Sequence, residues 1–119
     1  MAWGAVEQIV VDAADPAALA RFWAVLLGGE PVDRDDGWSV IGGGPGRPRV
    51  SFQPVPEPKA RKNRLHLDIA AADIPAATAA LVTAGAIAVG AQVTDEQGTF
   101  QVLRDPEGNE FCLAWPPKP

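Results

Sequence analysis

Hydrophobic and polar residues follow one another in the same order in two halves of the chain. Residues 8–16 place an alternating apolar run before a small-residue turn, an aspartate and a proline, and residues 66–75 repeat this order without a gap up to the aspartate. Repetition of this kind indicates architecture more firmly than local propensity does. We therefore expect two copies of one module, each beginning with a strand and a helix.

Two helices are predicted directly after the repeated aspartates. Asp15 and Asp73 are suited to the N-cap position, where a carboxylate accepts hydrogen bonds from free backbone N–H groups of the first turn. The first helix is expected to end near Leu27, with Gly28 as its left-handed residue, and the second to stop at Gly85. Their predicted contact faces are Leu19, Phe22, Trp23 and Leu26 in the first helix and Ala77, Ala80, Leu81 and Ala84 in the second.

Three β-type runs follow each helix, separated by turns rich in glycine, proline and aspartate. The runs are residues 30–34, 38–41 and 49–53 in the first half and 87–91, 99–103 and 110–115 in the second. Together with the strand that precedes each helix, they predict a βαβββ order in both halves.

The two modules are expected to form one α+β domain over residues 1–119, with a curved, partly open, eight-stranded barrel-like sheet and two main helices. Module one covers about residues 5–54, a proline-rich linker about 55–63, and module two about 64–115. A ferredoxin-like fold is the minor alternative, because it needs two strands between its helices where this sequence has four strand-like runs.

Composition and charge exclude several classes of protein. The 119 residues are 47% hydrophobic and 21% charged, which is typical of a folded domain. The net charge is −5, and the basic residues lie mainly between Lys59 and Arg64, so nucleic acid is not an expected partner. A secretory signal pattern and an apolar run of membrane-spanning length are both missing, which predicts a cytoplasmic protein that does not bind a membrane.

Polar side chains alternate with apolar ones in four of the predicted strands. Gln8 opposes Ile9 and Val11, Gln53 opposes Phe52, His66 shares a face with Asp68, and Glu110 shares a face with Cys112. We expect the apolar faces to meet the helices. The polar faces would then line the concave side of the sheet and form a small-molecule pocket.

Three phrases resemble the glyoxalase-like branch of the vicinal oxygen chelate superfamily, and the similarity covers roughly Val6 to Trp115. They are residues 53–59, residues 62–68 and residues 103–112, the last of which contains the Asp-Pro-Glu-Gly-Asn turn. The resemblance implies metal-ligand positions at Gln8, Gln53, His66 and Cys112, with Glu110 one strand repeat earlier. It also implies a divalent ion such as Zn, Ni, Mn or Fe, and a homodimer.

This set of ligands is weak for a hard divalent ion. Two positions hold neutral carboxamides, and the position where a glutamate is usual holds the thiol of Cys112. We therefore expect no strong metal site. His66 is either a ligand or a residue that lines the pocket, and Glu110 is either a general base, if burial raises its pKa, or an exposed strand glutamate.

The other candidate residues also have two interpretations. Cys112 is expected to be a small buried side chain and not a nucleophile, because no positive charge lies near it in sequence. The aromatic residues either form a cage around a ligand or belong to the core, and these are Trp38, Phe52, Phe100 and Trp115. The basic stretch from Lys59 to Arg64 either attracts an anionic ligand or is a solvated linker.

Three functions are compatible with these residues. The first is a module that binds an apolar or aromatic small molecule, and the second is a lyase or isomerase that uses His66 and Glu110. The single histidine of the chain argues against a dioxygenase, because the facial triad of such enzymes needs two histidines. The third is a surface for self-association, with Trp3 or Trp115 at a dimer contact.

Overall fold

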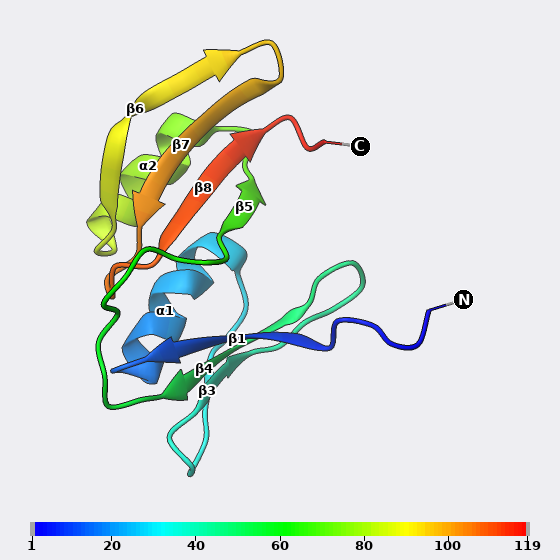
Figure 1. Ribbon diagram of the computed structural model, residues 1–119, viewed down its shortest axis with the longest axis vertical. Coiled ribbons are helices and arrows are strands. Elements are labelled where there is room, and N and C mark those ends of the chain that lie inside the picture. The colour runs from blue at the N-terminus through cyan, green and yellow to red at the C-terminus, as the bar shows by residue number, and fades with distance from the viewer. Residues whose placement is uncertain (1, 119) are drawn as a thin grey trace. The chain divides into compact units, whose positions relative to one another are not determined.

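The computed structural model describes residues 2–118, which contain two helices and eight strands in two four-stranded sheets. The chain divides between Pro58 and Lys59 into two compact units, here named unit 1 and unit 2. Each unit has the order βαβββ (Figure 1). The predicted α+β class with two such modules is confirmed.

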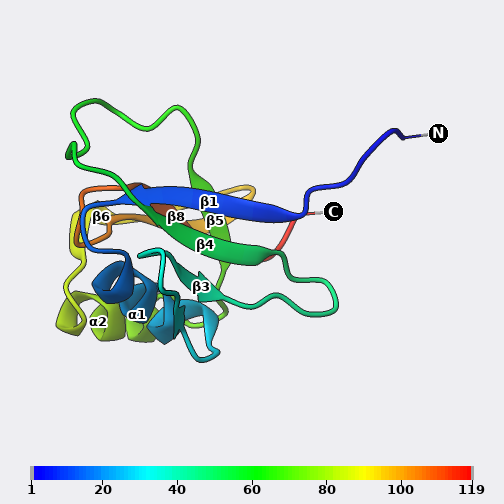
Figure 2. The same cartoon turned by 90° about the horizontal axis from the view of Figure 1, so that it is seen from below.

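Unit 1 packs one helix on one sheet. Its elements are β1 (Gln8–Ala13), α1 (Pro16–Leu27), β2 (Val32–Asp33), β3 (Ser39–Ile41) and β4 (Arg49–Pro54). The sheet order is β1-β4-β3-β2, with β1 and β4 parallel. Helix α1 covers one face of this sheet (Figure 2). The buried side chains of this layer include Leu19, Phe22, Trp23, Val50 and Phe52.

Unit 2 repeats this arrangement. Its elements are β5 (Leu67–Ala70), α2 (Ile74–Thr83), β6 (Ile87–Asp95), β7 (Gly98–Arg104) and β8 (Glu110–Trp115). The sheet order is β5-β8-β7-β6, with β5 and β8 parallel. Helix α2 contacts β6, β7 and β8. The buried side chains of this unit include Ile74, Leu81, Leu103, Phe111 and Leu113.

Both helices begin at the predicted aspartates. The Asp15 carboxylate accepts a hydrogen bond from the Ala18 backbone N–H at 3.1 Å, and Asp73 accepts one from Ala76 at 3.1 Å. Gly28 follows α1 with a φ of 78°, a conformation that glycine adopts without steric cost. The predicted boundary of the first helix is therefore confirmed.

The contact face predicted for the second helix is partly wrong. Ala80 and Ala84 are exposed, whereas Ile74 and Leu81 are the buried residues of α2. The apolar stripe begins at Ile74, directly after the N-cap, and seven residues later Leu81 lies on the same side of the helix. The prediction failed because the two large side chains, Ile74 and Leu81, supply most of the buried apolar surface of α2, and the small alanines supply little.

Three strands differ most from their predicted limits. Strand β5 starts at Leu67, so His66 lies one residue before it, and Leu65 is exposed instead of facing the core. Strand β2 has only two residues. Strand β6 extends to Asp95 and forms the edge of its sheet, and its pairing with β7 shifts register after Val89. Neither helix within residues 2–118 has the length and apolar character needed to cross a membrane.

A buried carboxylate organises the turn between β7 and β8. Asp105 is only 2% exposed, and its Oδ1 accepts hydrogen bonds from the backbone N–H groups of Glu107 and Asn109, both at 2.9 Å. The Asn109 side-chain amide donates to both carboxylate oxygens. Gly108 has a φ of 87°, which the turn requires. These contacts explain why the sequence contains Asp, Gly and Asn at this spacing.

Replacing Asp105 should destabilise the protein clearly. Asp105→Ala leaves several buried donors without an acceptor, which costs about 2–4 kcal/mol of the free energy of unfolding. Asp95→Ala is the matched control, because exposed Asp95 accepts one backbone hydrogen bond in the turn between β6 and β7. Urea unfolding monitored by circular dichroism measures both variants, and equal losses would contradict this role of Asp105.

Candidate functional site

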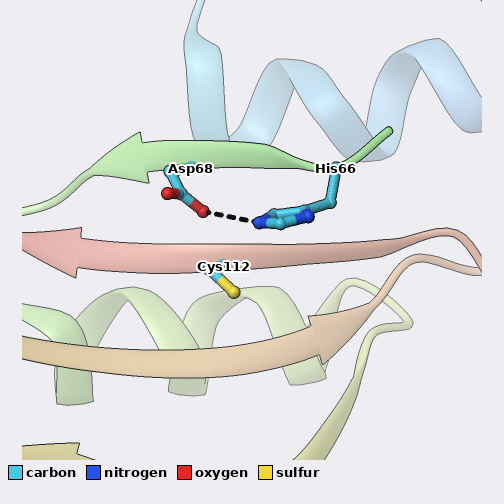
Figure 3. A group of neighbouring side chains, drawn as sticks. All are labelled: His66, Asp68 and Cys112. Carbon is cyan, nitrogen blue, oxygen red and sulfur yellow. Dashed lines mark ion pairs between the residues drawn. The ribbon is translucent and has the colours of Figure 1, made fainter. Parts of the chain in front are cut away.

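Unit 2 brings three possible metal or ligand contacts together at the junction of β5 and β8. A nitrogen of His66, a carboxylate oxygen of Asp68 and the sulfur of Cys112 all lie within 4.8 Å of one another. The His66 and Asp68 side chains extend from the start of β5 toward β8, on which Cys112 lies (Figure 3). Asp68 and Cys112 are direct neighbours in the parallel register, which explains their proximity.

His66 and Asp68 form an exposed pair. The His66 Nε2 atom lies 3.3 Å from the Asp68 Oδ1 atom, and both side chains are about 60% exposed. Water screens a pair of this kind, so it adds little to stability. Its chemical effect is local, because the negative charge of Asp68 beside Nε2 favours a proton on that atom, which leaves Nδ1 of a neutral ring as an acceptor.

Cys112 is half-buried, and its thiol is held in the protonated form. Burial raises the pKa of the Cys112 thiol, and the negative charges of Asp68 and Glu110 raise it further. Because thiolate is the nucleophilic species, this environment makes Cys112 less reactive than a free cysteine. The expectation that Cys112 lacks an activating positive charge agrees with this direction of the pKa.

Glu110 lies two residues before Cys112 on β8 and is neutralised by lysines. Its Oε2 atom lies 3.0 Å from Lys62 Nζ, and its Oε1 atom lies 4.0 Å from Lys59 Nζ. The hydrogen bond from Lys62 lowers the pKa of Glu110. The raised pKa on which a general-base role depended is therefore not found. The stability that this pair contributes is present above the ordinary glutamate pKa and is lost as the pH falls through the lowered value.

Apolar side chains border the three contacts. In the antiparallel register of β7 and β8, Val102 lies beside Cys112 and Phe100 lies beside Ala114, so these side chains share one face of the sheet. Val102 and Phe100 are both half-buried. The face opposite α2 therefore combines a polar group of residues with an apolar strip.

The two candidate carboxamides lie in unit 1 and are not neighbours. The Gln8 Oε1 atom accepts a hydrogen bond from Ser51 Oγ at 2.7 Å, whereas Gln53 lies beside Asp12. The neighbour of Gln8 in the register is Arg49. Gln53 is four residues further along β4, which corresponds to about 13 Å along the strands. In the structure the side chain of Gln8 contacts Ser51, and joint metal binding by Gln8 and Gln53 stays a prediction.

The repeat identifies a residue that the sequence analysis missed in unit 1. Val10 and Asp68 occupy matching positions in the two modules, and their neighbours in the parallel register are Ser51 and Cys112. Ser51 is therefore the counterpart of Cys112, a position two residues before Gln53. Asp68 was also missed as a site residue, although the alternation in this strand places it on the same face as His66.

The four aromatic candidates lie in different surroundings. Phe52 has no exposed surface and belongs to the core of unit 1, one of the two predicted interpretations. Trp38 lies in unit 1, where the Cζ atom of Arg34 is 5.5 Å from the centroid of the Trp38 ring. In unit 2, Phe100 borders the polar group, and Trp115 is 42% exposed at the end of β8. A pocket shared by both halves stays a prediction.

The donors in unit 2 fit a borderline metal ion. Imidazole, carboxylate and thiolate are all zinc ligands, and tetrahedral zinc with ligands at about 2.0–2.3 Å separates its donors by roughly 3.3–3.8 Å. The three donor atoms lie within 4.8 Å of one another, and the His66 and Asp68 side chains are exposed. Asp68 supplies a carboxylate in this group, whereas the predicted set offered only the carboxylate of Glu110 as an alternative to Cys112. Binding would require loss of the Cys112 proton, so it would weaken as the pH falls.

The environment of Cys112 predicts slow alkylation. The rate of reaction with iodoacetamide should rise with pH to a midpoint above the ordinary thiol pKa, and Asp68→Asn should move this midpoint to lower pH because it removes a negative charge beside the thiol. Mass spectrometry over a pH series measures the rate. Asp95→Asn, which changes a distant aspartate of the same unit, should leave the midpoint unchanged, and an equal effect of both variants would contradict the assignment.

Comparison with known proteins agrees with the observed fold. Residues 8–114 match the model of the glyoxalase-like domain family. No curated protein is significantly similar in sequence.

Several solved structures share the fold at low sequence identity. A glyoxalase/bleomycin resistance protein/dioxygenase family enzyme from Burkholderia phytofirmans PsJN is 16% identical, with a TM-score of 0.79 over 93% of this chain and 98% of that chain. A glyoxalase/bleomycin resistance protein from Albidiferax ferrireducens T118 is 21% identical, with a TM-score of 0.74 over 93% and 98%. The fosfomycin resistance protein FosX from Mesorhizobium loti is 15% identical, with a TM-score of 0.76 over 98% and 95%. Since the family model spans nearly the whole chain, the protein belongs to the glyoxalase-like domain family of the vicinal oxygen chelate superfamily.

Proposed function

We propose that this protein binds a small organic molecule with an apolar or aromatic body on the face of the unit 2 sheet that lies opposite α2. The observation that carries this proposal is the convergence of His66, Asp68 and Cys112 beside half-buried Phe100 and Val102. Small-molecule sites typically combine an apolar surface with a few polar groups that fix orientation.

Each polar side chain has a distinct part in this proposal. Asp68 lies beside the Nε2 atom of the His66 ring, which leaves the Nδ1 atom to accept a hydrogen bond from a ligand. The protonated Cys112 thiol is a weak donor at the border of the apolar strip. Val102 and Phe100 would contact the body of the ligand. None of these contacts requires a metal ion.

Similar proteins support a small ligand. Two of the solved structures with this fold are named as a bleomycin resistance protein and a fosfomycin resistance protein. Both names refer to small organic compounds and not to macromolecules. By the same resemblance we propose that the chain acts in the cytoplasm as a homodimer. Trp3 and Trp115, which are both exposed, are candidate contact residues for such a dimer.

A metal-dependent lyase or isomerase is the second candidate, favoured by the three donor atoms within 4.8 Å. His66, Asp68 and Cys112 would hold the ion, which supplies Lewis acidity toward an oxygen of the substrate when bound. Glu110 is not assigned the part of a base in this candidate, since Lys62 keeps it ionised and weakly basic.

The two candidates differ in their response to zinc and to an apolar dye. In the first, 8-anilinonaphthalene-1-sulfonate should bind in the presence of EDTA, and Val102→Ser should weaken its binding because the variant interrupts the apolar strip. Val82→Ser, on the exposed side of α2, is the matched control and should leave the binding of the dye unchanged. Fluorescence titration measures the affinity, and an equal loss in both variants would contradict the proposed surface.

Zinc sulfate tests the second candidate separately. A specific ion stabilises the fold by about 2.7 kcal/mol at a hundred times its Kd, so the melting temperature should rise in the native protein. The rise should be absent in Cys112→Ser and His66→Ala. If zinc leaves the melting temperature of the native protein unchanged, the metal-dependent candidate is rejected and the binding proposal is unaffected.

A further inference from the structure

Unit 2 contains a hollow beside the first residues of β8. Its volume is about 550 Å³. It lies between the segment that precedes β5 and the turn that joins β7 to β8. The lining residues are Lys59, Ala60, Arg61, Lys62, Arg104, Glu107, Gly108 and Glu110.

The charge of this hollow is opposite to that of the chain. Four of its lining side chains are cationic and two are anionic, whereas the chain as a whole has a net charge of −5. Anions are repelled by the molecule at long range, so a local excess of positive charge forms a distinct attractive site. The basic stretch from Lys59 to Arg64 is therefore more than a solvated linker, because three of its cations line a concave surface.

Both walls of the hollow are held in place. On one side, the buried Asp105 carboxylate fixes the turn, and the Lys59 side chain lies against it, with its Cδ atom 4.0 Å from where a Cβ at Gly108 would be. On the other side, the Asn63 amide donates to the backbone oxygens of Leu65 and Glu110. The backbone that positions the cationic side chains is therefore held in place before a ligand binds.

Among the described residues, two of the cations form no direct side-chain contact, although Arg104 lies near enough to Glu110 to help lower the pKa of that carboxyl. Within residues 2–118, the guanidinium groups of Arg61 and Arg104 form no salt bridge and no side-chain hydrogen bond. Lys62 and Lys59 are engaged by Glu110, which occupies the same hollow. A guanidinium group presents paired N–H donors that match the oxygens of a phosphate or a carboxylate.

We propose that this hollow is a binding site for a small oxyanion, either a phosphate group or a carboxylate group, held by Arg61 and Arg104. Glu110 is a competitor within the site, because its carboxylate holds the two lysines that would otherwise bind the anion. The site is separate from the proposed surface at His66, and it does not depend on that surface or on a metal ion.

Titration of the whole chain with sodium phosphate and with sodium succinate tests this site. Amide NMR spectra at neutral pH and constant ionic strength, balanced with sodium chloride, should show saturable shifts in residues 59–62 and 104–110. Saturation by phosphate alone or by succinate alone identifies the group that binds, and either result supports the site. If neither anion produces saturable shifts there, the proposal is overturned.

Three arginine variants separate the site from general attraction. Arg61→Ala and Arg104→Ala should weaken binding about fivefold. Arg64→Ala removes the same charge from the same segment but lies outside the hollow, so it should change the affinity less than about twofold. Equal losses in Arg61→Ala and Arg64→Ala would show diffuse attraction and overturn the proposal. All three side chains belong to exposed residues, and unchanged urea midpoints would confirm that the variants are folded.

Glu110→Gln provides an independent test, because it should raise the affinity for the anion where the arginine variants lower it. It removes the competing charge and frees Lys62, so the affinity for the anion should increase about threefold. A decrease in affinity would overturn the proposed part of Glu110. Because this variant is measured with phosphate and succinate, its outcome does not depend on the dye and zinc experiments.

Discussion

The parallel pairing of β5 with β8 is the contact on which the rest of unit 2 depends. It joins the first and the last strand of the module and places Asp68 directly beside Cys112. His66 is the residue before β5, and it lies beside Asp68 through their ion pair. Loss of this register by one residue would turn Cys112 toward α2 and separate the three donors, because successive side chains of a strand point to opposite faces.

Much of the fold follows from local chemistry that the sequence displays. The caps at Asp15 and Asp73 and the glycine after α1 each act within a few residues, so they can be predicted without knowing the tertiary structure. The contact face of α2 could not be predicted as well. An alanine-rich helix offers several faces of similar apolar character, and its packing on the sheet decides which one is buried.

The candidate site was predicted less completely than the fold, because its contacts join residues that are distant in sequence. His66 and Cys112 were found by resemblance to a family, but Asp68 was missed since its significance depends on the register of β5 and β8. The surroundings of Glu110 were also hidden. Its salt-bridge partner Lys62 lies in a segment without regular structure, and no periodic pattern in the sequence predicts such a contact.

The register shift in β6 has a consequence for association between molecules. Strand β6 is an outer strand with mostly exposed residues, and such an edge can pair with a strand of another chain. Between Val89 and Val93 the regular ladder is interrupted, Gly90 takes a φ of 71°, and its carbonyl oxygen accepts a hydrogen bond from the buried Gln101 side chain. A foreign strand would therefore meet an interrupted row of donors and acceptors, so the bulge protects this edge against uncontrolled β-aggregation.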